Sequence, residues 1–454
     1  ITIQGNTGTG TIIDGGGIDR VFHIIGKNTV KITGITIRNG NAIADSGGGI
    51  RNAAGWVTLE DCVIDNNKAG STVAGKYGGG GIYNGETAQM IINRCEVTNN
   101  EVMNYTTQAV GGLIGGGGIF NNGTMTITQT TLRANQGRPF GAGILNTSGL
   151  PLTSGKLTIS ESIIESNINL ISSGGGLANA GGAAIIKRTI IRLNEADDGA
   201  GILNVAGTNK DGTVSGNVRL NSSVVHGNLG QGILNQGSLD ILYSTISSNR
   251  ALEGSGPDGG GILNRAPGTM TIANSTITGN RASRNGGGIS NGRSMELTNV
   301  TISGNISGQS SQGGFGDEVF LDRQDTNLDR AEFRNTIIGN NTNSTRNCAS
   351  GIELNITPII AGSGVVTSSG NNLEHGNTCG FAVATGDIIN TTPNLGPLVV
   401  NGNPAIETKL WDNSYPLTLM PQMGSATIGN AVCVNDFDQR LYGRPGADGK
   451  CDIG

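Results

Sequence analysis

The chain has 454 residues, a net charge of −5 and 78 glycines, and only 4% of its residues are aromatic. So few large side chains argue against a conventional thick core, whereas a narrow aliphatic cylinder is feasible. The acidic balance without basic clusters excludes an electrostatic footprint for nucleic acid or an anionic membrane. No apolar run reaches the ~20 residues of a transmembrane helix, so we expect neither a nucleic acid partner nor a transmembrane segment.

The first residues, Ile1-Thr2-Ile3, already have the pattern of a strand. No signal peptide precedes them, so we expect a processed chain or a fragment. Residues 1–40 are expected to form the opening coils of a repeated structure, and regular copies continue to about Asn305.

A two-part unit recurs along most of the sequence, and one copy runs from Gly260 to Asn280. Its first part reads Gly-Gly-Gly-Ile-x-Asn and its second reads apolar-x-apolar-x-x-small-x-aliphatic-x-x-Asn. Unequal distances between copies suit a solenoid with loops of different length. Disorder is the competing interpretation of such a composition, but the constant internal spacing argues against it. Copies of the first part end at Asn52, Asn84, Asn121, Asn146, Asn179, Asn204, Asn235, Asn264 and Asn291.

The spacing inside the second part predicts a bend. Met270 and Ile272 lie two residues apart and face the same way on a strand, as do Ser275 and Ile277. Three residues separate Ile272 from Ser275, so the chain must turn a tight corner there, while the other two corners of the repeat look loose. We predict an all-β fold, a single-stranded right-handed parallel β-helix with three short strands per coil.

Stacked coils should place identical side chains above one another. We expect Ile262 to lie between Ile233 and Ile289, and Ile277 to lie between Ile246 and Ile302. The asparagines that end the second part should form an amide ladder at one corner. They are Asn67, Asn100, Asn135, Asn167, Asn194, Asn228, Asn249, Asn280, Asn305 and Asn341.

Long insertions leave the rod at two corners. One set comprises 68–77, 101–115 and 250–258, and the other comprises 147–156 and 205–217. Insertions in solenoids commonly build the binding face, so each set is expected to gather along one edge.

The pattern decays after Asn305, where Gly313–Phe320 stands in place of the glycine-rich part. We predict a β-helix over residues 1–341 and an irregular cap over 342–454. Cys348 and Cys379 flank one irregular segment of the cap and Cys433 and Cys451 flank another, so both pairs suit disulfides in an oxidising compartment. Four free thiols are the alternative.

Two further cysteines, Cys62 and Cys95, occupy the same inward position in adjacent coils. The spacing of coils falls inside the Cα range of a disulfide, but parallel Cβ directions make its dihedral angle awkward. The sequence leaves open whether they are bonded or are buried thiols.

The C-terminal residues resemble a known signature. Asn347-Cys348, Ser369–Leu373, Thr378–Phe381, Pro393–Leu398, Asp438-Gln439-Arg440, Gly443-Arg444-Pro445 and Cys451–Gly454 are similar to the end of bacterial choice-of-anchor β-helix proteins. With the coils included, the resemblance covers nearly the whole chain, and it implies a secreted or surface-anchored protein. The coils also resemble, more weakly, the repeats of polymorphic outer-membrane adhesins. Family members usually carry more sequence at both ends, including the anchor, so attachment is in doubt here.

No catalytic or metal-binding constellation stands out. Asp197-Asp198 is the most suggestive carboxylate pair, but adjacent residues diverge on a strand and a solvated turn explains them better. His226 should be a plain surface histidine. Calcium is the one cofactor considered, through Asp436 and Asp438, which could equally pair with Arg440 or Arg444.

One outward column is unusually apolar and is a candidate interface stripe: Tyr83, Phe120, Leu145, Leu203, Leu234 and Leu263. Either corner loops or the C-terminal segment cover it, or it contacts another subunit. The outward columns of the third strand are polar, as in Thr245/Ser247, Thr276/Thr278 and Thr301/Ser303. An ice-binding plane there would be interrupted by Arg133, Glu165 and Arg192.

The sequence therefore predicts an extracellular or cell-surface structural or adhesive protein that could assemble into a filament or layer. Expected partners are further copies of the chain or a surface or matrix component, including a polysaccharide. The alternative is a polysaccharide lyase or glycoside hydrolase of the pectin-lyase-like fold.

Overall fold

The computed structural model describes residues 1–6, 10–43, 45–70, 78–103, 114–148, 155–169, 172–209, 212–214, 216–251, 258–308, 314–322, 330–339, 346–352, 355–357, 366–400, 417–434, 437–444 and 449–454. The chain divides into two compact units, Ile1–Val218 and Arg219–Gly454, and each is described by itself.

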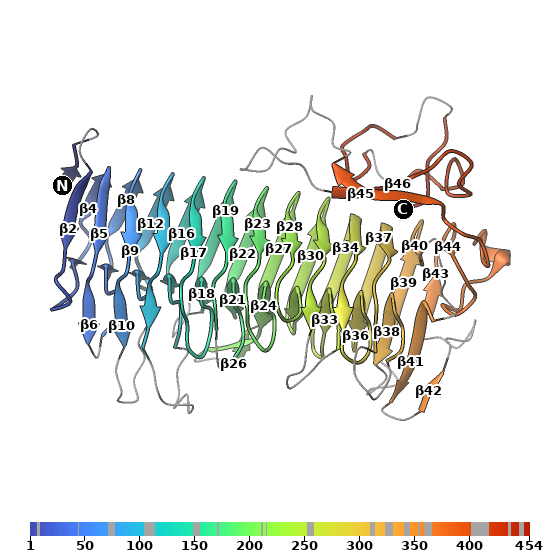
Figure 1. Ribbon diagram of the computed structural model, residues 1–454, viewed down its shortest axis with the longest axis horizontal. Coiled ribbons are helices and arrows are strands. Elements are labelled where there is room, and N and C mark those ends of the chain that lie inside the picture. Colours follow the sequence, from blue (N-terminus) through green and yellow to red (C-terminus); the bar gives the residue numbers. More distant parts are fainter. Residues whose placement is uncertain are drawn as a thin grey trace. The chain divides into compact units, whose positions relative to one another are not determined.

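Ile1–Val218 is a stack of coils whose strands pair in parallel with the strands of the next coil (Figure 1). Its largest sheet takes two strands from each coil. They are β1 (Thr2–Gln4), β2 (Thr11–Asp14), β4 (Thr29–Thr33), β5 (Ile35–Arg38), β8 (Trp56–Glu60), β9 (Val63–Asp65), β12 (Gln89–Asn93), β13 (Glu96–Thr98), β16 (Thr124–Thr128), β17 (Thr131–Arg133), β19 (Lys156–Ser160), β20 (Ile163–Glu165), β22 (Ala183–Lys187) and β23 (Ile190–Arg192).

The second sheet of this unit is built from the glycine-rich part of the repeat. Its strands are β3 (Phe22–Ile24), β7 (Ile50–Asn52), β11 (Ile82–Asn84), β15 (Ile119–Asn121), β18 (Ile144–Thr147), β21 (Leu177–Ala180) and β24 (Ile202–Val205). A small third sheet holds β6 (Asn41–Ile43), β10 (Lys68–Gly70) and β14 (Glu101–Val102), and β25 (Gly207–Asn209) forms a hairpin with β26 (Gly212–Val214).

Arg219–Gly454 repeats this plan. Strand β27 (Asn217–Asn221) spans the division between the units. The first sheet of this unit holds β28 (Val224–His226), β30 (Ser238–Leu242), β31 (Thr245–Ser247), β34 (Thr269–Thr278), β37 (Ser294–Ser303), β39 (Arg330–Arg334), β40 (Ile337–Ile338), β43 (Val366–Ser368) and β44 (Leu373–Glu374). The second holds β29 (Ile233–Asn235), β33 (Ile262–Asn264), β36 (Ile289–Asn291), β38 (Val319–Asp322), β41 (Cys348–Ile352) and β42 (Asn355–Thr357), and β32 (Arg250–Ala251) pairs with β35 (Arg281–Ala282).

The predicted columns are present. Ile262 pairs with Ile233 and Ile289, and Ile277 pairs with Ile246 and Ile302. All six side chains are fully buried. The parallel β-helix is therefore confirmed, with a core made of aliphatic residues stacked at one spacing.

A single residue in the left-handed region makes the predicted tight corner. It lies between the two strands of the first sheet, at Asp61 (φ 52°), Arg94 (φ 51°) and Glu161 (φ 49°). This one change of backbone conformation accounts for the three-residue step in the sequence. The prediction of two loose corners was wrong, because a second left-handed residue such as Asn66 (φ 51°) or Asn99 (φ 55°) turns the chain just before each ladder asparagine.

The asparagine ladder is present in both units. The Asn67 Nδ2 donates to Asn100 Oδ1 at 3.0 Å, and the same contact continues to Asn135, Asn167 and Asn194. It recurs from Asn228 through Asn249 and Asn280 to Asn305. Asn341 lies outside the described residues. The asparagines that end the glycine-rich part form a second ladder, which the sequence analysis did not predict: Asn52, Asn84, Asn121, Asn146, Asn179 and Asn204 in one unit, and Asn235, Asn264 and Asn291 in the other.

Parallel pairing continues past residue 341, where we expected the cap to begin. Strand β41 pairs with β38, β43 with β39, and β44 with β40. The more irregular part follows, with the 3₁₀ helix η1 (Val383–Thr385) and an antiparallel hairpin of β45 (Leu395–Val400) and β46 (Leu417–Pro421). The boundary between 341 and 342 remains a prediction.

Both predicted disulfides are confirmed. Cys348 is bonded to Cys379, with their Cα atoms 4.8 Å apart, and Cys433 is bonded to Cys451. Cys62 and Cys95 are buried free thiols, which settles the alternative that the sequence left open.

Candidate functional site

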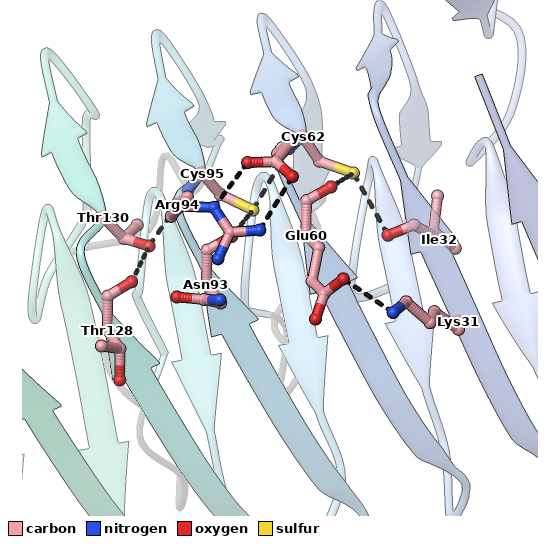
Figure 2. Close-up of polar contacts among 10 residues, drawn as sticks. Lys31, Ile32, Glu60, Cys62, Asn93, Arg94, Cys95, Thr128 and Thr130 are labelled. Atoms are coloured by element: carbon pink, nitrogen blue, oxygen red, sulfur yellow. Dashed lines mark hydrogen bonds and ion pairs between the residues drawn. The ribbon is translucent and has the colours of Figure 1, made fainter. Parts of the chain in front are cut away.

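The two free cysteines belong to a column of polar side chains inside the coils of Ile1–Val218 (Figure 2). The Cys62 backbone N–H donates to Cys95 Sγ at 3.3 Å, and the Cys95 N–H donates to Thr130 Oγ1 at 3.2 Å. Thr130 continues the pattern, donating its own N–H to Ser162 Oγ at 3.2 Å. The left-handed corner turns these N–H groups inward, where each needs an acceptor.

This column shows that the position described as small in the repeat is a hydrogen-bonding position. Each side chain also donates to the carbonyl two residues earlier, as Cys95 Sγ does to Asn93 O at 3.2 Å and Thr130 Oγ1 does to Thr128 O at 2.9 Å. The contact with the Cys62 thiol and burial raise the pKa of Cys95. Cys62 and Cys95 are only 1% and 3% exposed, so they hold neighbouring coils together and cannot reach a substrate.

Charged side chains on the outside of this unit pair between successive coils. At the corner Arg94 Nε lies 2.8 Å from Asp61 Oδ1, and on the third strand Arg192 Nε lies 2.9 Å from Glu165 Oε2. The hydrogen bond from Arg94 lowers the pKa of Asp61. A carboxylate held ionised by a guanidinium is poorly suited to general acid catalysis.

The carboxylate pair considered from the sequence lies in a turn. Asp197 is exposed, and its backbone N–H donates to Ser172 O at 3.0 Å. Asp198 forms a backbone bridge to Ser173. His226 is half-buried, with Nδ1 3.0 Å from Ser247 Oγ. Both segments therefore have roles in coil packing.

The sequence analysis missed a buried carboxylate at the end of the ladder. Glu318 Oε2 accepts from Asn305 Nδ2 at 2.6 Å, and Glu318 Oε1 accepts from the Gly304 N–H at 2.8 Å. Burial raises the pKa of Glu318 to about 7. In the preceding coil this position is Gly288, where a Cβ would lie 2.9 Å from Asn305 Nδ2. Replacing glycine by glutamate therefore puts a carboxylate where the next ladder asparagine would lie.

The candidate interface stripe is not an exposed surface. Phe120, Leu145, Leu203, Leu234 and Leu263 are all at most 8% exposed, and Tyr83 is half-buried. The glycine that precedes the repeat folds over the column, so that a Cβ on Gly259 would lie 2.7 Å from Leu263 Cβ. The chain itself therefore covers this column, which was the first of the two alternatives, and a contact with another subunit stays a prediction.

In Arg219–Gly454 the C-terminal segment covers the hydroxyl columns of the third strand. Gln439 Nε2 donates to Thr245 Oγ1 at 3.0 Å, and Thr276 Oγ1 donates to Gln439 Oε1 at 2.6 Å. Thr245 Oγ1 in turn donates to Leu417 O at 2.7 Å, at the start of strand β46 in the hairpin shown in Figure 1. Thr245 and Thr276 are buried by this docking, which excludes an ice-binding plane. The signature residues of the C-terminus thus fasten the segment to the coils.

A pocket of about 330 Å³ lies beneath this segment. Thr276, Thr301 and Asn299 line it from the coils, and Arg440 and Arg444 line it from the C-terminal segment. Its lining combines hydroxyl, guanidinium and apolar groups with the carboxylates of Asp438 and Asp452 and the ammonium group of Lys450.

Of the two calcium candidates, Asp438 lines this pocket. Asp436 lies outside the described residues, and Asp438 accepts from Arg440 Nε at 2.7 Å and from the Tyr442 N–H at 2.9 Å. This is the arginine pairing that was the alternative to calcium. Among the described residues, no group of three histidine, cysteine or acidic side chains is placed to hold a metal ion.

Comparison with known proteins assigns the chain to no family. No family model matches the chain, and no curated protein matches it. The crystal structure of pectate lyase Pel9A is similar, at 14% sequence identity and a TM-score of 0.44, over 94% of this chain and 86% of that chain. At this level the likeness adds nothing to the strand pairing on which the fold rests. The resemblance to choice-of-anchor proteins stays an expectation. No helix among the described segments could cross a membrane.

Proposed function

We propose that this protein is an extracellular structural β-helix that adheres to a surface or matrix polysaccharide through the open sheet face of Ile1–Val218. The observation that carries the proposal is the outward face of β4, β8, β12, β16, β19 and β22. Trp56 on this face is 58% exposed, and Ile91 and Ile185 are 49% and 38% exposed.

The surroundings of Trp56 suit a sugar chain. Trp56 pairs across the sheet with Thr29 on one coil and Gln89 on the next, and both are exposed. An aromatic ring offers a flat apolar face, and neighbouring hydroxyl and amide groups offer hydrogen bonds. Side chains repeat along this face at the coil spacing of about 4.8 Å, so an extended polymer would meet a regular row of contacts.

Two observations support an extracellular location and a structural role. The two disulfides fit an oxidising compartment. The asparagine ladders and the ion pairs between coils use polar side chains to stabilise the fold, which suits a structural role. The apolar stripe that suggested a filament is buried within the chain, so it gives no support to one.

Co-sedimentation with insoluble neutral and acidic polysaccharides tests the proposal. The native protein should bind at least one of them, and Trp56→Ala should weaken binding about tenfold, as expected for loss of a central aromatic contact. Ile91→Ala is the matched control, because it removes exposed apolar surface from the same face and should change binding less than about threefold. The proposal fails if no polysaccharide binds, or if the two variants behave alike.

The polysaccharide lyase or glycoside hydrolase remains the alternative. Turnover of an acidic polysaccharide by the purified protein would replace the adhesive proposal with it.

A further inference from the structure

The geometry points to a second site, independent of the Trp56 face: we propose that the pocket beneath the C-terminal segment binds a small hydroxylated carboxylate such as a hexuronate. Arg444 carries the argument. Its guanidinium is half-buried on the pocket wall, and its hydrogen bonds go to backbone carbonyls, to Gly454 O at 3.1 Å and Asp452 O at 3.5 Å.

Arg444 differs from the other arginine of the pocket. Arg440 is neutralised by Asp438, whose Oδ2 accepts from Arg440 Nε at 2.7 Å. Arg444 forms no ion pair with any described residue. Burial lowers its pKa, with Asp438 and Asp452 acting in the opposite direction. A guanidinium has five N–H donors in a planar fork, and two carbonyl oxygens leave part of that fork open for a carboxylate.

The opposite wall presents a hydroxyl to the same space. Thr301 lines the pocket from β37, and its side chain makes no hydrogen bond within the described part of the chain. Gly454 packs against this hydroxyl, since a Cβ there would lie 2.7 Å from Thr301 Oγ1, and the pocket adjoins the same side chain. A ligand in the pocket could supply the hydrogen-bond partner that buried hydroxyls normally have. Met420 and Ile428 add apolar surface between the two polar walls.

Size and composition together set the ligand class. A pocket of about 330 Å³ is at the lower end of the range of roughly 300–1,000 Å³ for small-molecule sites, which suits one sugar ring rather than a polymer. The lining carries three basic side chains, Arg440, Arg444 and Lys450, and two acidic ones, Asp438 and Asp452, and this excess of one positive charge suits a ligand with one negative charge. An unpaired hydroxyl and an apolar wall suit the hydroxyl groups and the C–H face of a sugar.

Isothermal titration of the full chain with glucuronate and galacturonate tests this inference, with glucose as the neutral match. We expect saturable binding of a uronate and at least tenfold weaker binding of glucose. Arg444→Gln should weaken uronate binding about tenfold or more, since it removes a charged hydrogen bond. Arg94→Gln, in an exposed ion pair of the other unit, should leave it unchanged.

Thr301→Val is a second test of the pocket, in case Arg444→Gln loosens the C-terminal segment. Valine matches threonine in shape, and no described hydrogen bond is lost. The substitution should weaken uronate binding several-fold. Absence of uronate binding, equal binding of glucose, or unchanged binding by both pocket variants would overturn the site. Displacement of uronate by equimolar sulfate would overturn the sugar assignment. Because Trp56→Ala leaves this pocket intact, uronate binding in that variant separates this inference from the adhesive function.

Discussion

The third strand of the coil presents two different outward faces in the two units. In Ile1–Val218 it carries Arg133, Glu165 and Arg192, which pair with charges on neighbouring coils and face solvent. In Arg219–Gly454 the equivalent position carries Ser247 and Thr278, which are buried. The outward position two residues earlier carries Thr245 and Thr276, which are buried under the C-terminal segment. Ion-paired side chains stay solvated, whereas short hydroxyls can be covered without leaving a charge unpaired. Side-chain choice on an unchanged backbone thus decides which face accepts a docking segment.

Substitutions in the asparagine ladder test whether the coils beneath the two outward faces are equally stable. Asn135 and Asn280 each accept from the backbone N–H and Nδ2 of one coil and donate to the next. Replacing either by alanine leaves several buried groups unsatisfied, so each should lower the free energy of unfolding by about 3–5 kcal/mol. Urea denaturation of both variants measures this. A loss below about 1 kcal/mol for one and above 3 for the other would show that the covering segment contributes to the ladder.

Placing a charged residue on the covered face and on the open face tests the comparison directly. Thr276→Arg places a charge under the C-terminal segment and should cost about 2–4 kcal/mol or release the segment. Thr131→Arg, at the equivalent open position of β17, is the matched control and should stay within about 0.5 kcal/mol. Limited proteolysis of the C-terminal segment, read beside thermal unfolding, distinguishes release from global loss. Equal effects of the two substitutions would contradict the distinction between the faces.

The pH dependence of stability sharpens the comparison at the ladder end. The folded pKa of Glu318 is about 7 and its unfolded value is 4.5. At a pH between these two pKa values the folded state holds a proton on Glu318 that the unfolded state has lost. The free energy of unfolding therefore falls as the pH rises from about 5 to 8. The change should be on the order of 2 kcal/mol and should disappear in Glu318→Gln. Thermal unfolding across this range measures it, and a pH profile that is unchanged in the glutamine variant would contradict the assignment.

The coils could be predicted because their signal is periodic. The step from Ile272 to Ser275 locates the corner, and the recurrence of asparagine locates the ladder. The polar column through Cys62, Cys95 and Thr130 also had a signal, because serine, threonine or cysteine recurs at that position, but it was interpreted only as a demand for small size.

Other features lack a periodic signal. Gln439 contacts Thr245 and Thr276, which are 194 and 163 residues away, and nothing in local spacing indicates that docking. Glu318 was not predicted as a ladder partner, because it lies in Gly313–Phe320, where the sequence no longer follows the repeat. The pocket at Arg444 follows from the docking, so it could not be found before the segment was placed.

The amide ladder has a direction. Along the ladder described above, each Nδ2 donates one hydrogen to the Oδ1 of the next coil, while its other hydrogen goes to a carbonyl of the preceding coil, as Asn67 Nδ2 does to Ile37 O at 3.1 Å. The first member, Asn67, needs a donor for its Oδ1, and the Gly40 N–H supplies one. Asn305, the last member within the described residues, needs an acceptor ahead of it, and Glu318 supplies that. Each interior asparagine accepts hydrogen bonds from the coil before it and donates one to the coil after it. A whole coil could therefore be duplicated or removed there without leaving a ladder donor or acceptor unpaired. The length of this protein is therefore free to vary by whole turns in the course of evolution, while its two ends are not.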